Sequence, residues 1–310
     1  MKALVIGSNG MDGSHMCDLL LSKGYDVWGT YRKNKDHISK YVMNPKFHYV
    51  KLDLENIEYF FPTIAEIAPD EIYNFAGVSF SPDSERFPKL CEKINYASVM
   101  RLMESALALD CKFFQASSSE VFGKVSDLEI NESTERKPHT PYADAKNEVD
   151  RWLKYYRGEG AKFYTAISFN HESERRGEKF VTRKITRSLA QIVNNQRSRL
   201  IMGNLDSRRD WGYAPDYVEG FYKMVQSHPD EYILATGTTH SVRDILDICG
   251  NYLGIDWQDY VIIEPTLQRV GERNNIWGNA SKIKQNLGWS PTTSFEDMII
   301  KMLKYDLEYV

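Results

Sequence analysis

Residues 2–24 read KALVIGSNGMDGSHMCDLLLSKG, and this segment sets the architecture expected for the rest of the chain. The apolar run at 3–6 predicts a buried strand, and the apolar spacing within 16–20 predicts one face of a helix. Between them lie three glycines at the spacing G-x-x-G-x-x-G, namely Gly7, Gly10 and Gly13. A strand, a tight turn and a helix N-terminus bring backbone N–H groups and the positive end of the helix dipole together. The segment therefore predicts a site for the pyrophosphate of a dinucleotide.

Short apolar runs continue to alternate with helical patterns and glycine-bearing turns through the first half of the chain. This alternation predicts a parallel, doubly wound α/β sheet of the Rossmann type. In such a sheet ligands bind at the carboxyl ends of the strands, so we expect function at that edge. The strands are expected at 3–6, 25–30, 47–52, 71–75, 112–116 and 163–169.

The motifs QASSSEVFG (115–123) and TPYADAK (140–146) contain the candidate catalytic groups. The first motif ends a strand and places Ser118 and Glu120 at the carboxyl edge of the sheet. The second begins a helix on which Tyr142 and Lys146 share one face, one turn apart. An ammonium beside a phenol favours the phenolate, so we expect the pKa of Tyr142 to move from about 10 toward neutrality. The phenolate can then act as a base while the serine hydroxyl orients the same substrate oxygen.

A nicotinamide cofactor is the ligand that this combination predicts. Cofactors without a 2′-phosphate are usually held by an acidic residue after the second strand, but Arg32 and Lys33 follow that strand here. NADP is therefore favoured, and NAD remains possible. The expected cofactor-binding residues are Gly7, Gly10, Met11, Asp12, Gly13, Arg32, Asp53, Leu54, Phe75, Ala76, Gly77, Tyr142 and Lys146.

Composition and charge exclude several other classes of protein. At 310 residues with 42% hydrophobic and 26% charged residues, the chain can bury a large core, which argues against disorder. The formal net charge of -4 argues against a nucleic-acid or membrane-surface partner. No apolar run approaches membrane-spanning length, and strand-like sequence follows Met1 with no room for a signal peptide. We therefore expect a cytoplasmic protein.

Cysteine and histidine spacing predicts no metal site. The cysteines at 17, 91, 111 and 249 are scattered singly and are expected to be reduced core thiols. His171 and Glu172 are adjacent, but no third ligand follows at a workable spacing.

The second half of the chain contains a basic segment and no glycine fingerprint. Its cations favour a bound polyanion such as a diphosphate, and a solvated helix face is the alternative explanation for part of them. They are Arg175, Arg176, Lys179, Arg183, Lys184, Arg187, Arg208 and Arg209. Strands are expected at 232–235 and 261–263, and helices at 242–253, 280–287 and 295–305, with the loop 268–278 reaching back to the ligand. We expect 1–168 to form a dinucleotide-binding domain and 169–310 to form mainly a smaller α/β substrate lobe, with some segments returning to the first domain.

These motifs together resemble the extended short-chain dehydrogenase/reductases that act on nucleotide sugars. Five segments are similar to parts of the GDP-mannose 4,6-dehydratases: GSNGMDGSH, ASSSEVFGK, FNHESERRGEKFVTRKITRS, GNLDSRRDWGYAPDYVEG and ATGTTHSVRD. The resemblance implies that Ser118, Glu120, Tyr142 and Lys146 are catalytic. It also implies a homodimer or homotetramer, although the basic arm at 32–45 is shorter than is typical of that family. The residues that it implies for GDP-sugar binding are Asn170, Val181, Lys184, Asn204, Arg209, Arg269 and Glu272.

The implied reaction is a dehydration without net oxidation. Tyr142 takes the proton of the sugar 4-hydroxyl while C4 gives hydride to the nicotinamide, Glu120 removes the C5 proton as water leaves C6, and the hydride returns to C6. Three alternatives stay open. The enzyme could be a C4 dehydrogenase, epimerase or keto-reductase on the same scaffold; the sugar could be a hexose such as mannose or a heptose; or the chain could be a non-catalytic regulator that binds a sugar nucleotide.

Overall fold

The structure, a computed structural model, describes residues 1–310 apart from 34, 126–127 and 268–274. Its centre is a seven-stranded parallel sheet with the strand order β11-β7-β5-β4-β1-β2-β3. The chain runs outward from β1 in one direction and then from β4 in the other, so the order reverses between these two strands. The predicted doubly wound Rossmann-type sheet is confirmed. Its strands are β1 (Lys2–Ile6), β2 (Asp26–Tyr31), β3 (Phe47–Lys51), β4 (Glu71–Asn74), β5 (Lys112–Ser118), β7 (Phe163–Ser168) and β11 (Glu231–Leu234).

Helices cover both faces of the sheet, so side chains of β1 are buried on both sides. Ala3 and Val5 belong to a core shared with α1 (Met11–Ser22) and α8 (Ala214–Val225). The alternate residues Leu4 and Ile6 contact the opposite layer. That layer consists of α2 (Phe60–Ile67), α5 (Ser98–Ala108) and α6 (Pro141–Gly158).

The helical segment between β4 and β5 has an internal irregularity. It starts as α4 (Pro88–Glu92), which follows α3 (Ser81–Arg86), and then passes through a π-helical segment, Lys93–Ala97, before α5. A π-helical turn carries one extra residue and redirects the side chains within it. Asn95 lies in this segment and is buried.

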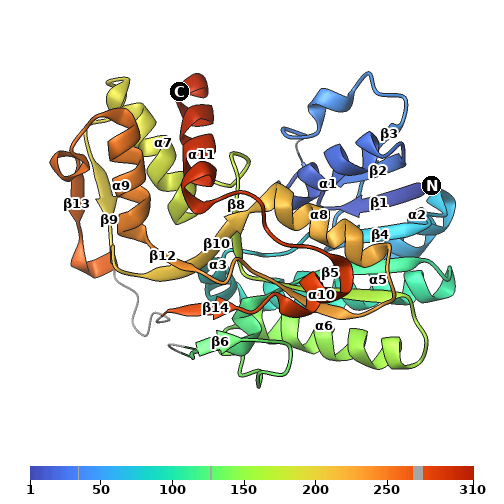
Figure 1. The fold of residues 1–310 in the computed structure, drawn as a ribbon. Helices are drawn as coiled ribbons and strands as arrows, with labels where there is room; N and C mark the ends of the chain where they lie inside the picture. Colours follow the sequence, from blue (N-terminus) through green and yellow to red (C-terminus); the bar gives the residue numbers. More distant parts are fainter. Residues whose placement is uncertain (34, 126–127, 268–274) are drawn as a thin grey trace.

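The second half of the chain forms small sheets and a separate helical core. Figure 1 shows α7 (Val181–Val193), α9 (Val242–Leu253) and α11 (Phe295–Tyr309) beside one another, away from the central sheet. These three helices bury a common apolar cluster. The remaining elements are β8 (Asn170–Glu172), β10 (Arg208–Tyr213) and β12 (Thr239–Ser241) in one sheet, β9 (Leu200–Met202) with β13 (Val261–Ile263), β6 (Leu128–Ile130) with β14 (Ile276–Gly278), and α10 (Ser281–Leu287).

The chain crosses back to the central sheet after β10. The helix α8 packs against α1, and β11 pairs in parallel with β7 at the edge of the sheet. The cysteines at 17, 91, 111 and 249 are buried and free, as predicted. Within the described part of the chain, no helix has both the length and the apolar character needed to cross a membrane.

Candidate active site

The glycine turn after β1 is closed so tightly that side chains have no room. Gly7 has a φ of +82°, and a Cβ built there lies 2.8 Å from the backbone nitrogen of Ala76. A Cβ on Gly13 lies 2.2 Å from the carbonyl oxygen of Gly7. The helix α1 begins at Met11, and its N-cap Gly10 has no side chain to satisfy the first N–H groups. A bare backbone at a helix N-terminus suits the pyrophosphate of a dinucleotide.

The loop after β4 approaches this turn and is held by Asn95 from the π-helical segment. The Val78 N–H donates to Asn95 Oδ1 at 2.8 Å, and Asn95 Nδ2 donates to the Val78 carbonyl at 3.0 Å. A Cβ on Gly77 lies 2.9 Å from the same Oδ1. Asn95 was not among the site residues predicted from the sequence. The feature that could have indicated it is a single amide side chain within an otherwise apolar helical pattern.

Several predicted cofactor contacts have other partners in the structure. Asp12 lies 3.0 Å from His171 Nε2 in β8. Burial opposes this pair, but their mutual attraction and hydrogen bond lower the pKa of Asp12 and raise that of His171. Asp53 accepts from the Glu55 N–H at 3.1 Å, and the Phe75 ring packs on Phe114. Leu54 is buried.

The basic arm after β2 folds onto its own subunit. Arg32 is half-exposed and lies 3.8 Å from Glu55, and Lys33 is exposed. Further along the arm, the His37 N–H donates to Asn9 Oδ1 in the glycine turn at 2.9 Å. Lys40 lies 2.7 Å from Asp18 in α1. The arm therefore borders the cofactor side of the same chain.

The four predicted catalytic residues converge at the carboxyl end of β5. Ser118 is the last residue of β5, and its Oγ accepts from the Glu120 N–H at 3.2 Å. Thr140 caps the N-terminus of α6, which places Tyr142 and Lys146 in its first two turns. The Ser118 hydroxyl hydrogen-bonds Tyr142, and the Glu120 carboxylate acts on the same phenol. Tyr142 and Lys146 are both buried.

We predicted that the Lys146 ammonium lowers the pKa of Tyr142. For the protein groups alone, without a bound cofactor, this prediction is wrong. Burial is the largest cause that raises the pKa of Tyr142 to about 12. The hydrogen bond from Ser118 opposes this shift, and the charge of Glu120 adds to it. The Lys146 Nζ donates to the Ala116 carbonyl at 2.7 Å and lies 5.8 Å from the Tyr142 ring centroid. Burial lowers the pKa of Lys146 to about 8. Ionisation of Tyr142 thus requires positive charge beyond that of Lys146.

The predicted substrate residues lie on neighbouring elements of the second half. Asn170 in β8 is paired in register with Trp211 of β10, the strand that also contains Arg209. Val181 begins α7, and Lys184 in this helix donates to the Ile201 carbonyl of β9 at 2.6 Å. Asn204 follows β9 and accepts from the Asp206 N–H. Arg269 and Glu272 lie outside the described residues.

Much of the basic segment is paired with carboxylates of the same chain, an arrangement that neither a bound polyanion nor a solvated helix face predicted. The ion pairs, which reach from α1 to α11, are Arg175 with Asp18 (2.6 Å), Arg176 with Glu172 (3.0 Å), Lys179 with Asp83 (3.4 Å), Arg183 with Asp306 (2.7 Å) and Arg187 with Glu178 (3.1 Å). A hollow of about 400 Å³ remains beside Arg175, Arg176 and His37.

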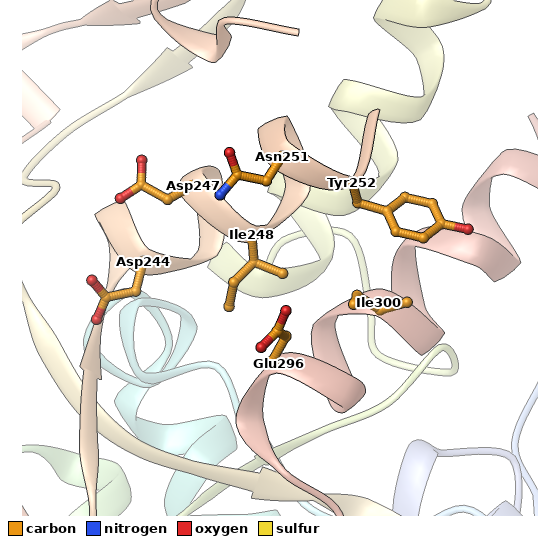
Figure 2. Close-up of a pocket in the computed structure, with 7 residues that line it drawn as sticks. All are labelled: Asp244, Asp247, Ile248, Asn251, Tyr252, Glu296 and Ile300. Carbon is orange, nitrogen blue, oxygen red and sulfur yellow. The ribbon is translucent and has the colours of Figure 1, made fainter. Parts of the chain in front are cut away.

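A second hollow, of about 490 Å³, lies between α9 and α11. Figure 2 shows the carboxylates of Asp244, Asp247 and Glu296 around it, together with Ile248 and Tyr252. The acidic lining repels a diphosphate. This hollow is therefore not the nucleotide-sugar site.

The parallel sheet and the meeting of serine, tyrosine and lysine at the carboxyl end of β5 define an extended short-chain dehydrogenase/reductase. Residues 4–302 match the family model described as GDP-mannose 4,6 dehydratase, and the chain belongs to that family. It is 39% identical over 326 residues to GDP-mannose 4,6 dehydratase 2 of Arabidopsis thaliana, covering 99% of this chain and 87% of the relative. It is 35% identical over 352 residues to GDP-mannose 4,6-dehydratase of Vibrio cholerae, covering 99% and 93%. Among solved structures, RMD from Pseudomonas aeruginosa complexed with NADPH has a TM-score of 0.83 at 19% identity, covering 100% of this chain and 99% of the other.

Proposed function

We propose that this protein is a NAD(P)-dependent GDP-sugar 4,6-dehydratase with GDP-mannose, or a related GDP-hexose or GDP-heptose, as its substrate. Family membership over nearly the whole chain supports the reaction class. The observation that carries the proposal is the Glu120 carboxylate beside Tyr142, because elimination of water needs a second proton-transfer group that plain oxidation of C4 does not.

The residues around the glycine turn fit a dinucleotide. Gly7, Gly10 and Gly13 would hold its pyrophosphate, and the 76–78 loop would approach it closely. Arg32 and Lys33 would face a 2′-phosphate, which favours NADP over NAD. Solved structures of this fold contain NADPH in one case and NAD in others, so the preference rests on Arg32 and Lys33.

The mechanism follows from the positions of the protein groups. When bound, the nicotinamide would supply a reversible hydride acceptor and a positive charge. Ser118 orients the sugar 4-oxygen, and Tyr142 accepts the proton of the 4-hydroxyl as C4 is oxidised. Glu120 then takes the C5 proton, which the adjacent ketone makes acidic, and passes it to the 6-hydroxyl, which leaves as water. Hydride would return to C6 while C5 takes up the proton that Tyr142 received from the 4-hydroxyl, so C4 is oxidised, C6 is reduced, and one water is lost overall.

We further propose that the GDP-sugar lies between the two halves of the chain, with 1–168 as the cofactor domain and 169–310 mainly as the substrate lobe. The residues that would contact the substrate are Asn170, Val181, Lys184, Asn204, Arg209, Arg269 and Glu272. We place the Arg209 guanidinium at the diphosphate, where a charge-assisted contact would contribute roughly 1.5–3 kcal/mol.

A cytoplasmic homo-oligomer is the form that we propose for the protein. Trp152 and Tyr155 are large exposed residues whose rings contact one another on the outer face of α6, and a second copy of the chain would cover them. Sedimentation of the Trp152→Glu variant tests this interface, because a monomer is expected where the native chain forms a dimer or a tetramer.

The test of function is incubation with a panel of GDP-hexoses and GDP-heptoses, followed by mass spectrometry of the sugar nucleotide. A product lighter by one water supports the dehydratase. A product lighter by two hydrogens identifies a C4 dehydrogenase, and binding without any change of mass identifies a regulator.

A further inference from the structure

One buried carboxylate lies directly behind the catalytic set. Asp150 is one helical turn after Lys146 in α6 and is 1% exposed. Its Oδ2 accepts from the Ser117 hydroxyl at 2.5 Å and from Arg136 Nη1 at 2.9 Å. Its Oδ1 is buried and has no hydrogen-bond partner among the described residues. Burying a carboxylate with one oxygen unsatisfied is unfavourable, so a compensating role is expected.

Asp150 links the strand and the helix that contribute catalytic groups. Ser117, which donates to it, precedes Ser118 at the end of β5. Ala116, one residue earlier, accepts the hydrogen bond from Lys146. A single side chain of α6 therefore fixes the strand end on which both the serine and the lysine depend.

The charge of Asp150 also acts on Lys146. Burial opposes the ammonium form of Lys146, and Asp150 is the first of the neighbouring charges that favour it, ahead of Cys91 and Asp12. A buried ammonium is stable only where a nearby negative charge offsets its loss of hydration. Asp150 is almost fully enclosed between α6 and the end of β5, so solvent screens its attraction to Lys146 little.

Other charged groups around Asp150 determine how much of its charge persists. Burial raises its pKa, and Glu231 of β11 acts in the same direction. Arg136 lowers it most, followed by the Ser117 hydrogen bond and the Lys146 ammonium. Arg136 also lies 2.7 Å from Glu231, and Arg157 of α6 is near enough to be influenced by Asp150. Arg136 therefore favours the ionised form of Asp150 and pairs with Glu231 at the same time.

We propose that Asp150 is a positioning residue for the reaction, whose buried carboxylate keeps Lys146 charged and holds the end of β5 against α6. This proposal rests on the catalytic set of the proposed function, but it concerns the state of Lys146 and not the identity of the sugar. Its consequence is that Asp150 sets the pH at which activity is lost on the alkaline side.

The test is Asp150→Asn, which preserves shape and removes the charge. An opposite charge at close range shifts a pKa by about 1–3 units, so the alkaline limb of the kcat profile is expected to move about one pH unit lower. GDP affinity and cofactor affinity should stay within about twofold, since Asp150 does not face the ligands. A purely structural role would lower activity equally at every pH.

A second readout does not depend on activity. NMR spectra of the NADP-bound protein with isotope-labelled lysine report the charge of Lys146, and its resonance is assigned by its absence in the Lys146→Arg variant. In Asp150→Asn the pH at the midpoint of its titration should fall, as the alkaline limb of the kcat profile does. This midpoint is measured without any GDP-sugar, so a failure of the dehydratase assignment leaves it unaffected. Glu148→Gln, which removes a half-exposed carboxylate of the same helix, should leave both values unchanged.

If Asp150→Asn does not fold, Ser117→Ala provides the same test in a milder form. Loss of the hydroxyl raises the pKa of Asp150, reduces its negative charge, and should shift the Lys146 midpoint in the same direction by a smaller amount. A folded variant of either kind whose Lys146 midpoint and alkaline limb equal those of the native protein overturns the proposal.

Discussion

Lys146 is the residue at which function and stability oppose each other most clearly. Its ammonium is buried, and burial lowers its pKa from 10.5 to about 8. The folded state therefore disfavours the charged lysine relative to the unfolded chain. The full penalty acts below pH 8, where Lys146 is protonated in both the folded and the unfolded chain. It disappears as the pH rises through 10.5, the pKa of this lysine in the unfolded chain.

We predict that Lys146→Met abolishes activity and stabilises the fold. Removal of the buried charge outweighs loss of one hydrogen bond, for a net gain of about 1–3 kcal/mol at pH 7 and a rise of a few degrees in melting temperature. The gain should shrink between pH 8 and 10.5 in urea titrations. Lys154→Met, on the exposed side of α6, is the control and should change stability little. A less stable Lys146→Met protein at pH 7 would contradict the argument.

Replacement of Glu120 distinguishes the elimination of water from the oxidation of C4. The Glu120→Gln variant keeps Tyr142 and should still oxidise C4, but it lacks the base for C5, so reduced cofactor should accumulate with GDP-mannose and be visible by its absorbance. Tyr142→Phe is the matched control, because without the phenol oxidation at C4 fails and no absorbance should appear. Normal product formation by Glu120→Gln would show that another group removes the C5 proton.

At the scale of elements, the glycine turn leaves no room for side chains. A Cβ on Gly13 meets the Gly7 carbonyl oxygen at 2.2 Å, and this oxygen belongs to the backbone, so it cannot rotate away as a side chain could. The turn must therefore open if Gly13 is replaced, and the helix N-terminus moves away from the pyrophosphate.

We predict that Gly13→Ala weakens NADP binding by at least about tenfold, equivalent to about 1.4 kcal/mol. Gly158→Ala at the end of α6 is the control, since a Cβ there meets nothing within 4 Å. Isothermal calorimetry measures both affinities. Equal affinities for the two variants would mean that the turn does not bind the pyrophosphate.

The elements that sequence predicts well here are those whose signal is local. The strands at β1 and β5 and the helix α9 follow from apolar periodicity, and the convergence of Ser118 with Tyr142 follows from the rule for parallel sheets. The pair β6–β14 joins residues about 150 positions apart through three-residue strands, and such short runs carry no periodicity of their own.

Side-chain environments were the least predictable feature. The spacing of Tyr142 and Lys146 showed that they share a helix face, but not that the lysine bonds the Ala116 carbonyl. Burial and the choice among competing acceptors depend on residues distant in sequence. The predicted direction of the Tyr142 pKa was wrong for that reason.

For the whole molecule, the apolar clusters on the two faces of the central sheet and the separate cluster of α7, α9 and α11 predict two units of differing stability. Met302 of α11 is fully buried in the cluster of α7, α9 and α11, and Met103 of α5 is fully buried against the central sheet. Truncation of either side chain to alanine should destabilise its core by about 2–5 kcal/mol.

We predict that Met302→Ala increases hydrogen exchange in α7, α9 and α11 while β1, β4 and β5 keep native protection, and that Met103→Ala does the reverse. Mass spectrometry of peptides after exchange provides the measurement. Equal acceleration in both halves by either variant would mean that 1–168 and 169–310 unfold as one unit, against the proposed division.

The central claim is that hydride leaves C4 and returns to C6 of the same sugar while Tyr142 and Glu120 move protons. It is tested most directly with GDP-mannose that carries deuterium at C4. The account predicts a product lighter by one water, with the deuterium in its new methyl group at C6. A product without deuterium at C6, or a 4-ketone that retains its 6-hydroxyl while deuterium stays on the cofactor, would contradict it.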